Sequence, residues 1–283
     1  MSSTTSMKVT GLGPRLMVYG GAYSLSIATL FPIYYMINTA LKTEGQYGRS
    51  PFGLATKPTF SNLSTAWSTG GLGLDSDLFH SGVVAIGGTA LCVAVATLAG
   101  YGLSQMRPKI RRRLLLPIVS FMMITPPVLI VPLYLTMIRF GLENTFLGAI
   151  LAYAALFTPF AVYLTTAFFG EVSKEVLEAA RCDGAGPLQR FRHVVLPMGR
   201  PAVTTLGVLL FLWIWNDLLF ALFLLQGSAV RTAMVSIAQL IGNYNVPETG
   251  LTAGLLIALL PPAVVFLLFQ SKVERGLTLG AGK

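Results

Sequence analysis

Residues 175–197 read EVLEAARCDGAGPLQRFRHVVLP, a polar segment that separates two long apolar stretches of the chain. Ser173 can cap a short helix at the start of this segment, because serine side chains accept hydrogen bonds from the first N–H groups of a helix. Gly184 is expected to end that helix, since glycine readily adopts the left-handed conformation. Pro187 is tolerated at a first helical position and begins a second helix, which Leu196-Pro197 should end. The segment therefore predicts a pair of short helices outside the apolar stretches.

The chain as a whole has the composition of a membrane protein. Of its 283 residues, 54% are hydrophobic and 11% are charged, against roughly 25% charged residues in soluble domains. A bilayer core of about 30 Å needs about 20 mostly apolar residues per helix. None of the long apolar stretches alternates as a barrel strand would. We therefore predict an all-α membrane protein with six transmembrane helices, at residues 16–40, 79–103, 114–138, 146–169, 201–225 and 251–269.

Lysine and arginine are distributed unevenly around these six segments. If the N-terminus lies in the cytoplasm, 15 of the 20 basic residues fall on the cytoplasmic side, as the positive-inside rule describes. This orientation gives a cytoplasmic tail at 1–15, a six-helix domain at 16–271 with a cytoplasmic loop at 170–200, and a cytoplasmic tail at 272–283. The basic cluster at 107–113 has an alternative interpretation as a patch for nucleic acid or anionic lipid. The topology explains the cluster sufficiently, and no nucleic-acid partner is expected.

The sequence lacks the parts of an energy source and of a catalytic centre. A nucleotide-hydrolysing P-loop needs GxxxxGK followed by Ser or Thr, and the C-terminal GAGK has no residue after its lysine. An ion-driven carrier would be expected to hold ionisable residues deep in its helices, but the only Asp, Glu, Lys or Arg in the six segments is Asp217. Cys92 and Cys182 have no CxxC or Cys/His pattern around them, so we expect neither a disulfide nor a metal site. No cofactor and no catalytic residue is predicted, and the energy should come from another polypeptide.

The polar segment contains one ordered set of small residues, two carboxylates, an aromatic residue and a final Leu-Pro pair. Its members are Glu178, Ala179, Ala180, Asp183, Gly184, Ala185, Phe191, Leu196 and Pro197. This order resembles the EAA-type motif of permease subunits in binding-protein-dependent ABC importers. The resemblance implies that these residues belong to a coupling helix that inserts into a groove on an ATPase subunit. On composition alone, an amphipathic loop folded against the bundle's own inner surface is equally compatible.

Other parts of the chain extend the resemblance. Residues 141–145 (GLENT), 215–219 (WNDLL), 231–232 (RT) and 276–281 (GLTLGA) are similar to the second permease subunit of maltose-type carbohydrate importers. The family implies a type I ABC importer permease fold in a bacterial or archaeal cytoplasmic membrane. It also implies a second, homologous permease subunit, two ABC ATPase subunits that bind ATP and Mg²⁺, and an extracytoplasmic solute-binding protein. Cys182 stands where that family usually has an aliphatic residue, and we expect no consequence.

Asp217 follows about 16 residues of the segment 201–225, which places it about 24 Å from the inner edge of the membrane at 1.5 Å per residue. Because a charged group within the membrane is energetically costly, a carboxylate there is first considered as part of a functional site. Asn216 and Asp217 would then line a substrate pathway, with Trp213 or Trp215 offering an apolar face to a sugar. The alternative, which we favour, is that Asp217 makes an interhelical hydrogen bond that stabilises the bundle.

Two proline pairs and one loop supply further candidates. Pro126 and Pro261, each followed by a second proline, are predicted to interrupt their helices near the midplane of the membrane. Interrupted helices often border a translocation pathway, although kinks are equally common without such a role. On the outer side, the loop at 226–250 contains Asn243, Tyr244 and Asn245, which we assign to contact with the binding protein.

The sequence thus predicts a permease subunit of an ABC importer, which forms half of the translocation pathway for a sugar. The pathway would open and close as ATP binding in a partner chain moves the coupling helix. A permease for a phosphorylated polyol or another polar solute is a close alternative, because the motif indicates contact with an ATPase and does not identify the transported solute. An ion-coupled carrier and a membrane-embedded enzyme are alternatives of other classes, and the shortage of ionisable residues within the membrane disfavours both.

Overall fold

The structure, a computed structural model, describes residues 12–68, 73–227, 230–241 and 247–281. Within these ranges every regular element is a helix, as predicted. The elements are α1 Leu12–Ala40, α2 Glu44–Arg49, α3 Ser61–Trp67, α4 Leu74–Ser104, α5 Pro108–Met122, α6 Pro126–Arg139, α7 Phe146–Gly170, α8 Lys174–Cys182, α9 Pro187–Arg190, a π-helical turn η1 Phe191–Val195, α10 Leu196–Met198, α11 Arg200–Asn216, α12 Leu219–Leu224, α13 Ala233–Ile241 and α14 Glu248–Ala281.

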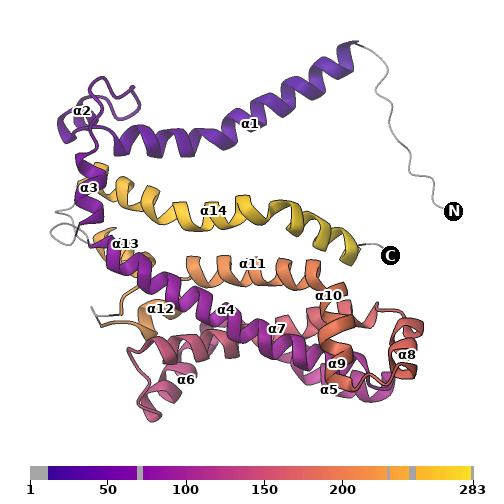
Figure 1. Ribbon diagram of the computed structural model, residues 1–283. Coiled ribbons are helices and arrows are strands. Elements are labelled where there is room, and N and C mark those ends of the chain that lie inside the picture. The colour runs from indigo at the N-terminus through magenta and orange to yellow at the C-terminus, as the bar shows by residue number, and fades with distance from the viewer. Residues whose placement is uncertain (1–11, 69–72, 228–229, 242–246, 282–283) are drawn as a thin grey trace.

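The long helices form a bundle in which α4 and α7 pack along each other, α11 packs on α4 and α14, and α1 packs on α14 (Figure 1). Small residues let α4 and α7 approach closely. A Cβ atom on Gly100 would overlap the Thr165 side chain, and Thr165 Oγ1 donates to Ala96 O across the interface at 2.8 Å. Close backbone approach of this kind is how helices associate in lipid, where no hydrophobic effect drives them together.

Two opposite ends of this bundle carry the short helices (Figure 1). We call the end with α8, α9 and α10 the coupling end, and the end with α3, α12 and α13 the outer end. At the periphery, α1 is exposed at residues 19–34 and buried only near its C-terminus. Its apolar side chains are therefore available to lipid or to another chain.

Among the described residues, three helices are each long and apolar enough to cross a membrane: α4, α7 and the part of α14 up to Val273. Two bent pairs, α5 with α6 and the α9–α10 segment with α11, raise the number of spans to as many as five. The predicted first segment corresponds to α1, whose 29 residues extend about 43 Å at 1.5 Å per residue. The count of six spans stays a prediction.

The two proline pairs behave differently. The segment at 114–138 is interrupted as predicted: α5 ends at Met122, α6 begins at Pro126, and the two axes differ by 97°. The predicted interruption at Pro261 is wrong, because α14 continues through Pro261 and Pro262. Pro262 has no N–H to bond the carbonyl four residues earlier, Ala258 O, and Trp215 Nε1 of α11 donates to that oxygen at 3.2 Å instead. A satisfied carbonyl lets a helix in a membrane tolerate proline.

Two other predicted boundaries also change. The segment at 201–225 is not one helix, because α11 ends at Asn216, Asp217 is extended, and α12 begins at Leu219. Leu196-Pro197 does not end the second short helix, since the chain stays helical to Met198 and bends by 76° before α11. Pro197 follows the π-helical turn, whose last bond runs from Leu196 N to Phe191 O.

Candidate functional site

The coupling loop consists of α8 and α9, which meet at a left-handed glycine. Ser173 Oγ accepts from Val176 N at 3.4 Å and caps α8, as predicted. At the other end Gly184 has φ +79°, and Ala185 N donates to Ala180 O at 3.0 Å. This is the Schellman arrangement that closes a helix and reverses the chain. The sharp turn fixes the angle between the two short helices.

One face of this loop is packed against the bundle. Phe191 is 8% exposed, and its ring centroid lies 5.2 Å from that of Tyr101 in α4 and 6.4 Å from that of Phe169 in α7. Leu177 and Val195 complete this cluster. Phe191 therefore points into its own bundle and does not present an aromatic ring to a partner.

The opposite face of the loop is open. Glu178, Ala179, Asp183 and Gly184 are exposed, while Ala180 is buried, and Ala185, Leu196 and Pro197 are half-buried. Both interpretations of the polar segment thus describe part of it: one face folds on the bundle and the other is free to contact a partner. A loop anchored in this way can transmit a displacement of its outer face to α4 and α7.

Asp217 lies at the break between α11 and α12. Its Oδ2 accepts from Tyr153 Oη of α7 at 2.7 Å and from Phe220 N and Ala221 N at 2.9 and 3.2 Å. The carboxylate therefore joins α7 to the first turn of α12, where a negative charge is stabilised by the unpaired N–H groups. These contacts agree with the favoured structural interpretation of Asp217.

An aromatic surface lies beside this break. Trp213 is 41% exposed, and its ring centroid lies 5.6 Å from that of Phe157 and 5.1 Å from that of Phe160, both in α7. An open cavity of about 160 Å³ lies between these rings and the α5–α6 break. Pro126 lines the same cavity, so the structure brings together two of the predicted pathway residues, Trp213 and Pro126.

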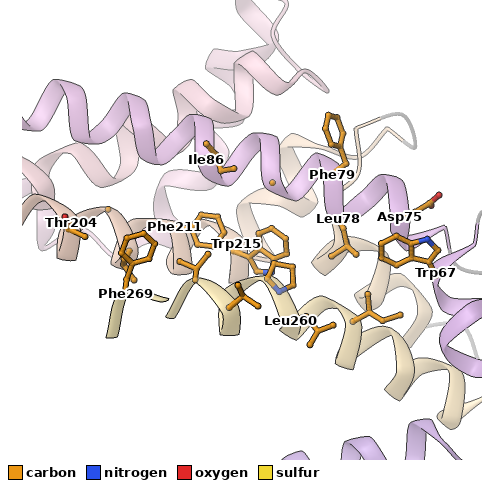
Figure 2. Close-up of a pocket in the computed structure, with 17 residues that line it drawn as sticks. Trp67, Asp75, Leu78, Phe79, Ile86, Thr204, Phe211, Trp215, Leu260 and Phe269 are labelled. Atoms are coloured by element: carbon orange, nitrogen blue, oxygen red, sulfur yellow. The ribbon is translucent and has the colours of Figure 1, made fainter. Parts of the chain in front are cut away.

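Asn216 is exposed at the end of α11, three residues after Trp213, and Pro261 lies elsewhere. Pro261 lines a groove of about 930 Å³ between α4, α11 and α14, shown in Figure 2. Most of its lining side chains are apolar, and the Trp215 N–H is already bonded to Ala258 O. An apolar helix or an acyl chain fits this groove. Asn243, Tyr244 and Asn245 lie outside the described residues.

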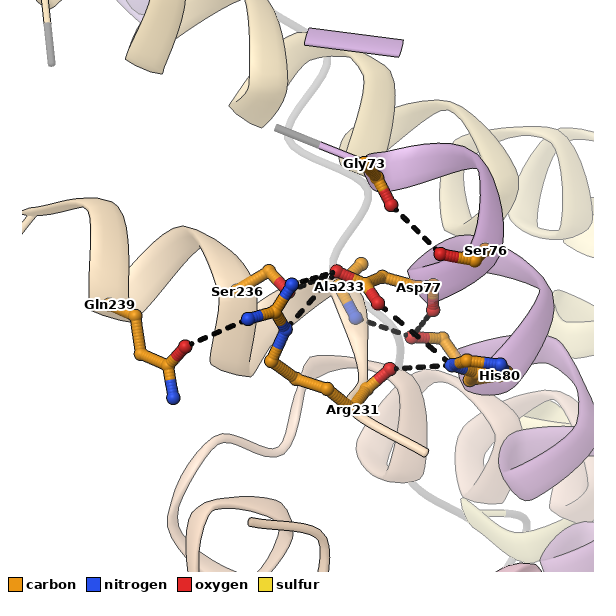
Figure 3. A network of polar contacts seen from close by, with 9 residues as sticks. Gly73, Ser76, Asp77, His80, Arg231, Ala233, Ser236 and Gln239 are labelled. Atoms are coloured by element: carbon orange, nitrogen blue, oxygen red, sulfur yellow. Dashed lines mark hydrogen bonds and ion pairs between the residues drawn. The ribbon is translucent and has the colours of Figure 1, made fainter. Parts of the chain in front are cut away.

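A buried polar network at the outer end was missed by the sequence analysis. Asp77 of α4 is 1% exposed, and its Oδ2 accepts from Nε and Nη2 of Arg231 at 3.3 and 3.2 Å and also from Ser236 Oγ (Figure 3). Ser81 Oγ accepts from Ala233 N at 2.9 Å. Together these contacts fasten α13 and the residues before it to the outer end of α4. The only sequence signal was a carboxylate and an arginine that flank different apolar segments on the same predicted side.

Residues 93–279 match the family of binding-protein-dependent transport system inner membrane components. The chain belongs to this family. It is 33% identical over 261 residues to a melibiose/raffinose/stachyose import permease protein of Bacillus subtilis, an alignment that covers 92% of this chain and 93% of that protein. A trehalose transport system permease protein of Mycobacterium tuberculosis is 34% identical over 281 residues, with 96% and 100% of the two chains covered.

The fold agrees with the family. A bacterial ABC transporter involved in the import of the polysaccharide alginate contains a chain that superposes with a TM-score of 0.80 at 22% identity, covering 92% of this chain and 98% of that one. The predicted resemblance, the all-α permease fold and the role as permease subunit of an ABC transporter are confirmed. The protein is a membrane component that works with a second permease, an ATPase in a separate chain and a binding protein, and it is not an enzyme.

Proposed function

We propose that the chain forms half of the pathway for an uncharged carbohydrate and that Trp213 contacts this solute. The observation that carries the proposal is the surface formed by Trp213, Phe157 and Phe160 at the α5–α6 break. Aromatic faces pack well against the C–H faces of sugar rings. Several relatives are named for transport of oligosaccharides, which supports the same solute class.

Asn216 adds a polar group to this surface. It lies three residues after Trp213, so the two side chains share one face of α11. Both are exposed, and Asn216 Nδ2 donates to Leu212 O at 2.8 Å. A polar group beside an aromatic face suits a ligand with apolar faces and hydroxyl edges. The residues that line the cavity include no charged side chain, which favours a neutral sugar over a phosphorylated polyol.

The coupling end would drive this pathway through α7. The exposed side of α8 would contact the ATPase through Ala179 and Asp183, and through Glu178, which also lines a basic cavity toward the α4–α5 turn. Phe191 on the other face touches Phe169 of α7, and the same helix carries Phe160, about 14 Å away at 1.5 Å per residue. Closure of the ATPase dimer on binding ATP would therefore tilt the helix that holds the aromatic surface.

The topology and the assembly complete the proposal. With α1 as the sixth span, both termini and the coupling loop lie in the cytoplasm of a bacterium or archaeon, and the loop at 226–250 faces the binding protein. The excess of basic residues on the coupling side supports this orientation. The exposed side of α1 and the groove of Figure 2 offer apolar surfaces to a homologous second permease, and two ATPase subunits would bind one coupling loop each.

Uptake by reconstituted complexes tests the role of Trp213. Trp213→Ala should raise the KM for the transported sugar about three- to tenfold, the range expected for loss of one aromatic stacking contact. Trp213→Phe should retain most of the affinity because a ring remains. Phe140→Ala, which removes an exposed ring beyond α6, is the matched control and should leave the KM unchanged. An unchanged KM in Trp213→Ala would refute the pathway assignment.

A further inference from the structure

A cavity at the coupling end differs from the cavity and the groove described above because several charged side chains line it. It measures about 510 Å³ and lies between the α4–α5 turn, the end of α7 and α8. Its charged lining consists of five basic side chains and one carboxylate: Arg107, Arg111, Lys174, Arg181, Arg190 and Glu178. Three separate stretches of the sequence supply the basic residues, so the fold, and not a local charge run, brings them together.

The basic side chains of this cavity form no ion pair among the described residues. Among the described residues, Asp77 is the one carboxylate within 4.0 Å of a basic side chain, and it lies at the outer end. Arg190 Nε is buried and has no hydrogen-bond partner. Arg111 is half-buried, with its guanidinium close to Gly170 at the end of α7. Like charges gathered at a partly buried site repel each other, so the arrangement favours an anion between them.

The position of the cavity indicates which anion it suits. After Arg111, Arg112 and Arg113, α5 continues into Leu114, Leu115 and Leu116, and Leu114 and Leu116 are exposed. The cavity therefore lies where the helix passes from a polar to an apolar environment. A ligand with a phosphate group in the cavity would have an apolar helix surface beside it for acyl chains.

We propose that this cavity binds the phosphate headgroup of an anionic phospholipid. Basic pockets between transmembrane helices on the cytoplasmic side are suited to such headgroups. Guanidinium groups form paired, charge-assisted hydrogen bonds with phosphate oxygens, and the buried Nε of Arg190 gains a partner. The bound headgroup bridges Arg111 of α5 to Lys174 and Arg181 of α8 and so steadies the coupling loop. The site is independent of the transported solute.

Native mass spectrometry of the assembled, detergent-purified complex, titrated with phosphatidylglycerol, tests the site. The double variant Arg111→Gln/Arg190→Gln should weaken retention of the lipid by on the order of tenfold or more, because each basic group near a headgroup contributes about fivefold. Arg112→Gln/Arg113→Gln removes the same charge from neighbouring exposed positions outside the cavity and should stay within about twofold of the unmodified complex. Equal losses in both double variants, or none in either, overturn the proposal.

Four further arms identify the ligand and control for folding. Phosphatidylcholine should not be retained, and inorganic phosphate at millimolar concentration should not displace phosphatidylglycerol. Displacement by phosphate would assign the cavity to a free anion. Retention only in complexes stripped of the ATPase would show that an acidic surface of that subunit fills the cavity, and either result overturns the lipid assignment. Arg111→Lys/Arg190→Lys, which keeps both charges, should assemble normally and retain the lipid more strongly than the glutamine pair.

Discussion

The two ends of the bundle differ in whether their charged side chains are paired within the chain. At the outer end, the buried carboxylate of Asp77 is paired with Arg231 and bonded by Ser236 of the same chain. At the coupling end, five basic side chains surround one cavity without an ion pair among the described residues. A charge satisfied internally holds elements together, whereas an unsatisfied one is available to a ligand or partner. Changes at the outer end should therefore cost stability, and changes at the coupling end should cost communication with partners.

The largest loss of stability is expected for Arg231→Met at the outer end. Asp77 would stay buried with Ser236 as its main partner, and removing one member of a buried ion pair costs about 3 kcal/mol or more. Asp77→Ala should cost less, about 1–2 kcal/mol, because Arg231 is 27% exposed and its charge can be hydrated. Thermal melting of the purified complex should show this order. The reverse order would contradict the stabilising role assigned to the network of Figure 3.

A smaller loss is expected midway between the two ends, at Trp215. Trp215→Phe removes the N–H that bonds Ala258 O beside Pro262, and an unsatisfied buried carbonyl costs about 1–3 kcal/mol. Adding Pro262→Ala restores the backbone N–H that can bond the same oxygen, so the double variant should recover most of the melting temperature. Spin labels on the two halves of α14 should report a bend in Trp215→Phe alone. If the losses of melting temperature in the two single variants simply added in the double variant, the Trp215 hydrogen bond would not explain why α14 continues through Pro262.

These contacts also explain how far the sequence could predict the structure. The long apolar stretches identified α4, α7 and α14, and local rules for serine caps and glycine turns placed α8 and its end at Gly184. The interruption at Pro126 was predicted because proline and the residue before it disfavour a continuing helix. The same rule failed at Pro261, where the outcome depends on an indole donor 43 residues away from the accepting residue.

Long-range partners likewise decided the candidate sites. Asp217 was singled out as one carboxylate in an apolar segment, but its bond to Tyr153 spans 64 residues. Arg190 and Arg111 share a cavity only after α5 and α8 have packed at the same end. No periodicity or motif encodes such pairs, because they follow from how the helices are arranged. The exposed positions of the coupling motif were predictable, since turn geometry is a local property.

Gly184→Leu should separate stability from coupling at the other end of the molecule. A side chain at φ +79° costs on the order of 1–2 kcal/mol locally, and the turn is exposed, so melting of the bundle should change little. The misdirected α8 should nevertheless abolish uptake. Gly186→Ala is the matched control, because Gly186 has φ −67° and a Cβ there would meet only Gln189 Oε1, at an ordinary contact distance of 3.9 Å, so it should transport normally. Normal uptake by Gly184→Leu would contradict the assigned turn.

The smallest effect on stability is expected for Glu178→Lys, which should nonetheless impair coupling. Glu178 is exposed and has no ion pair among the described residues, so the melting temperature should stay near that of the unmodified complex. If Glu178 contacts a basic residue of the ATPase, reversing its charge places like charges together, a change that costs several kcal/mol at a desolvated interface. Stimulation of ATP hydrolysis by solute-loaded binding protein, normalised to assembled complex, should then fall with uptake.

Glu171→Lys provides the matched charge reversal for this experiment. Glu171 follows α7 and is also exposed, but it lies outside the motif and does not line the basic cavity. Its variant should keep full stimulation. Equal impairment of both variants would indicate a general electrostatic effect on the coupling end. Full stimulation in Glu178→Lys would place the ATPase contact on another surface and leave the open face of α8 without a partner.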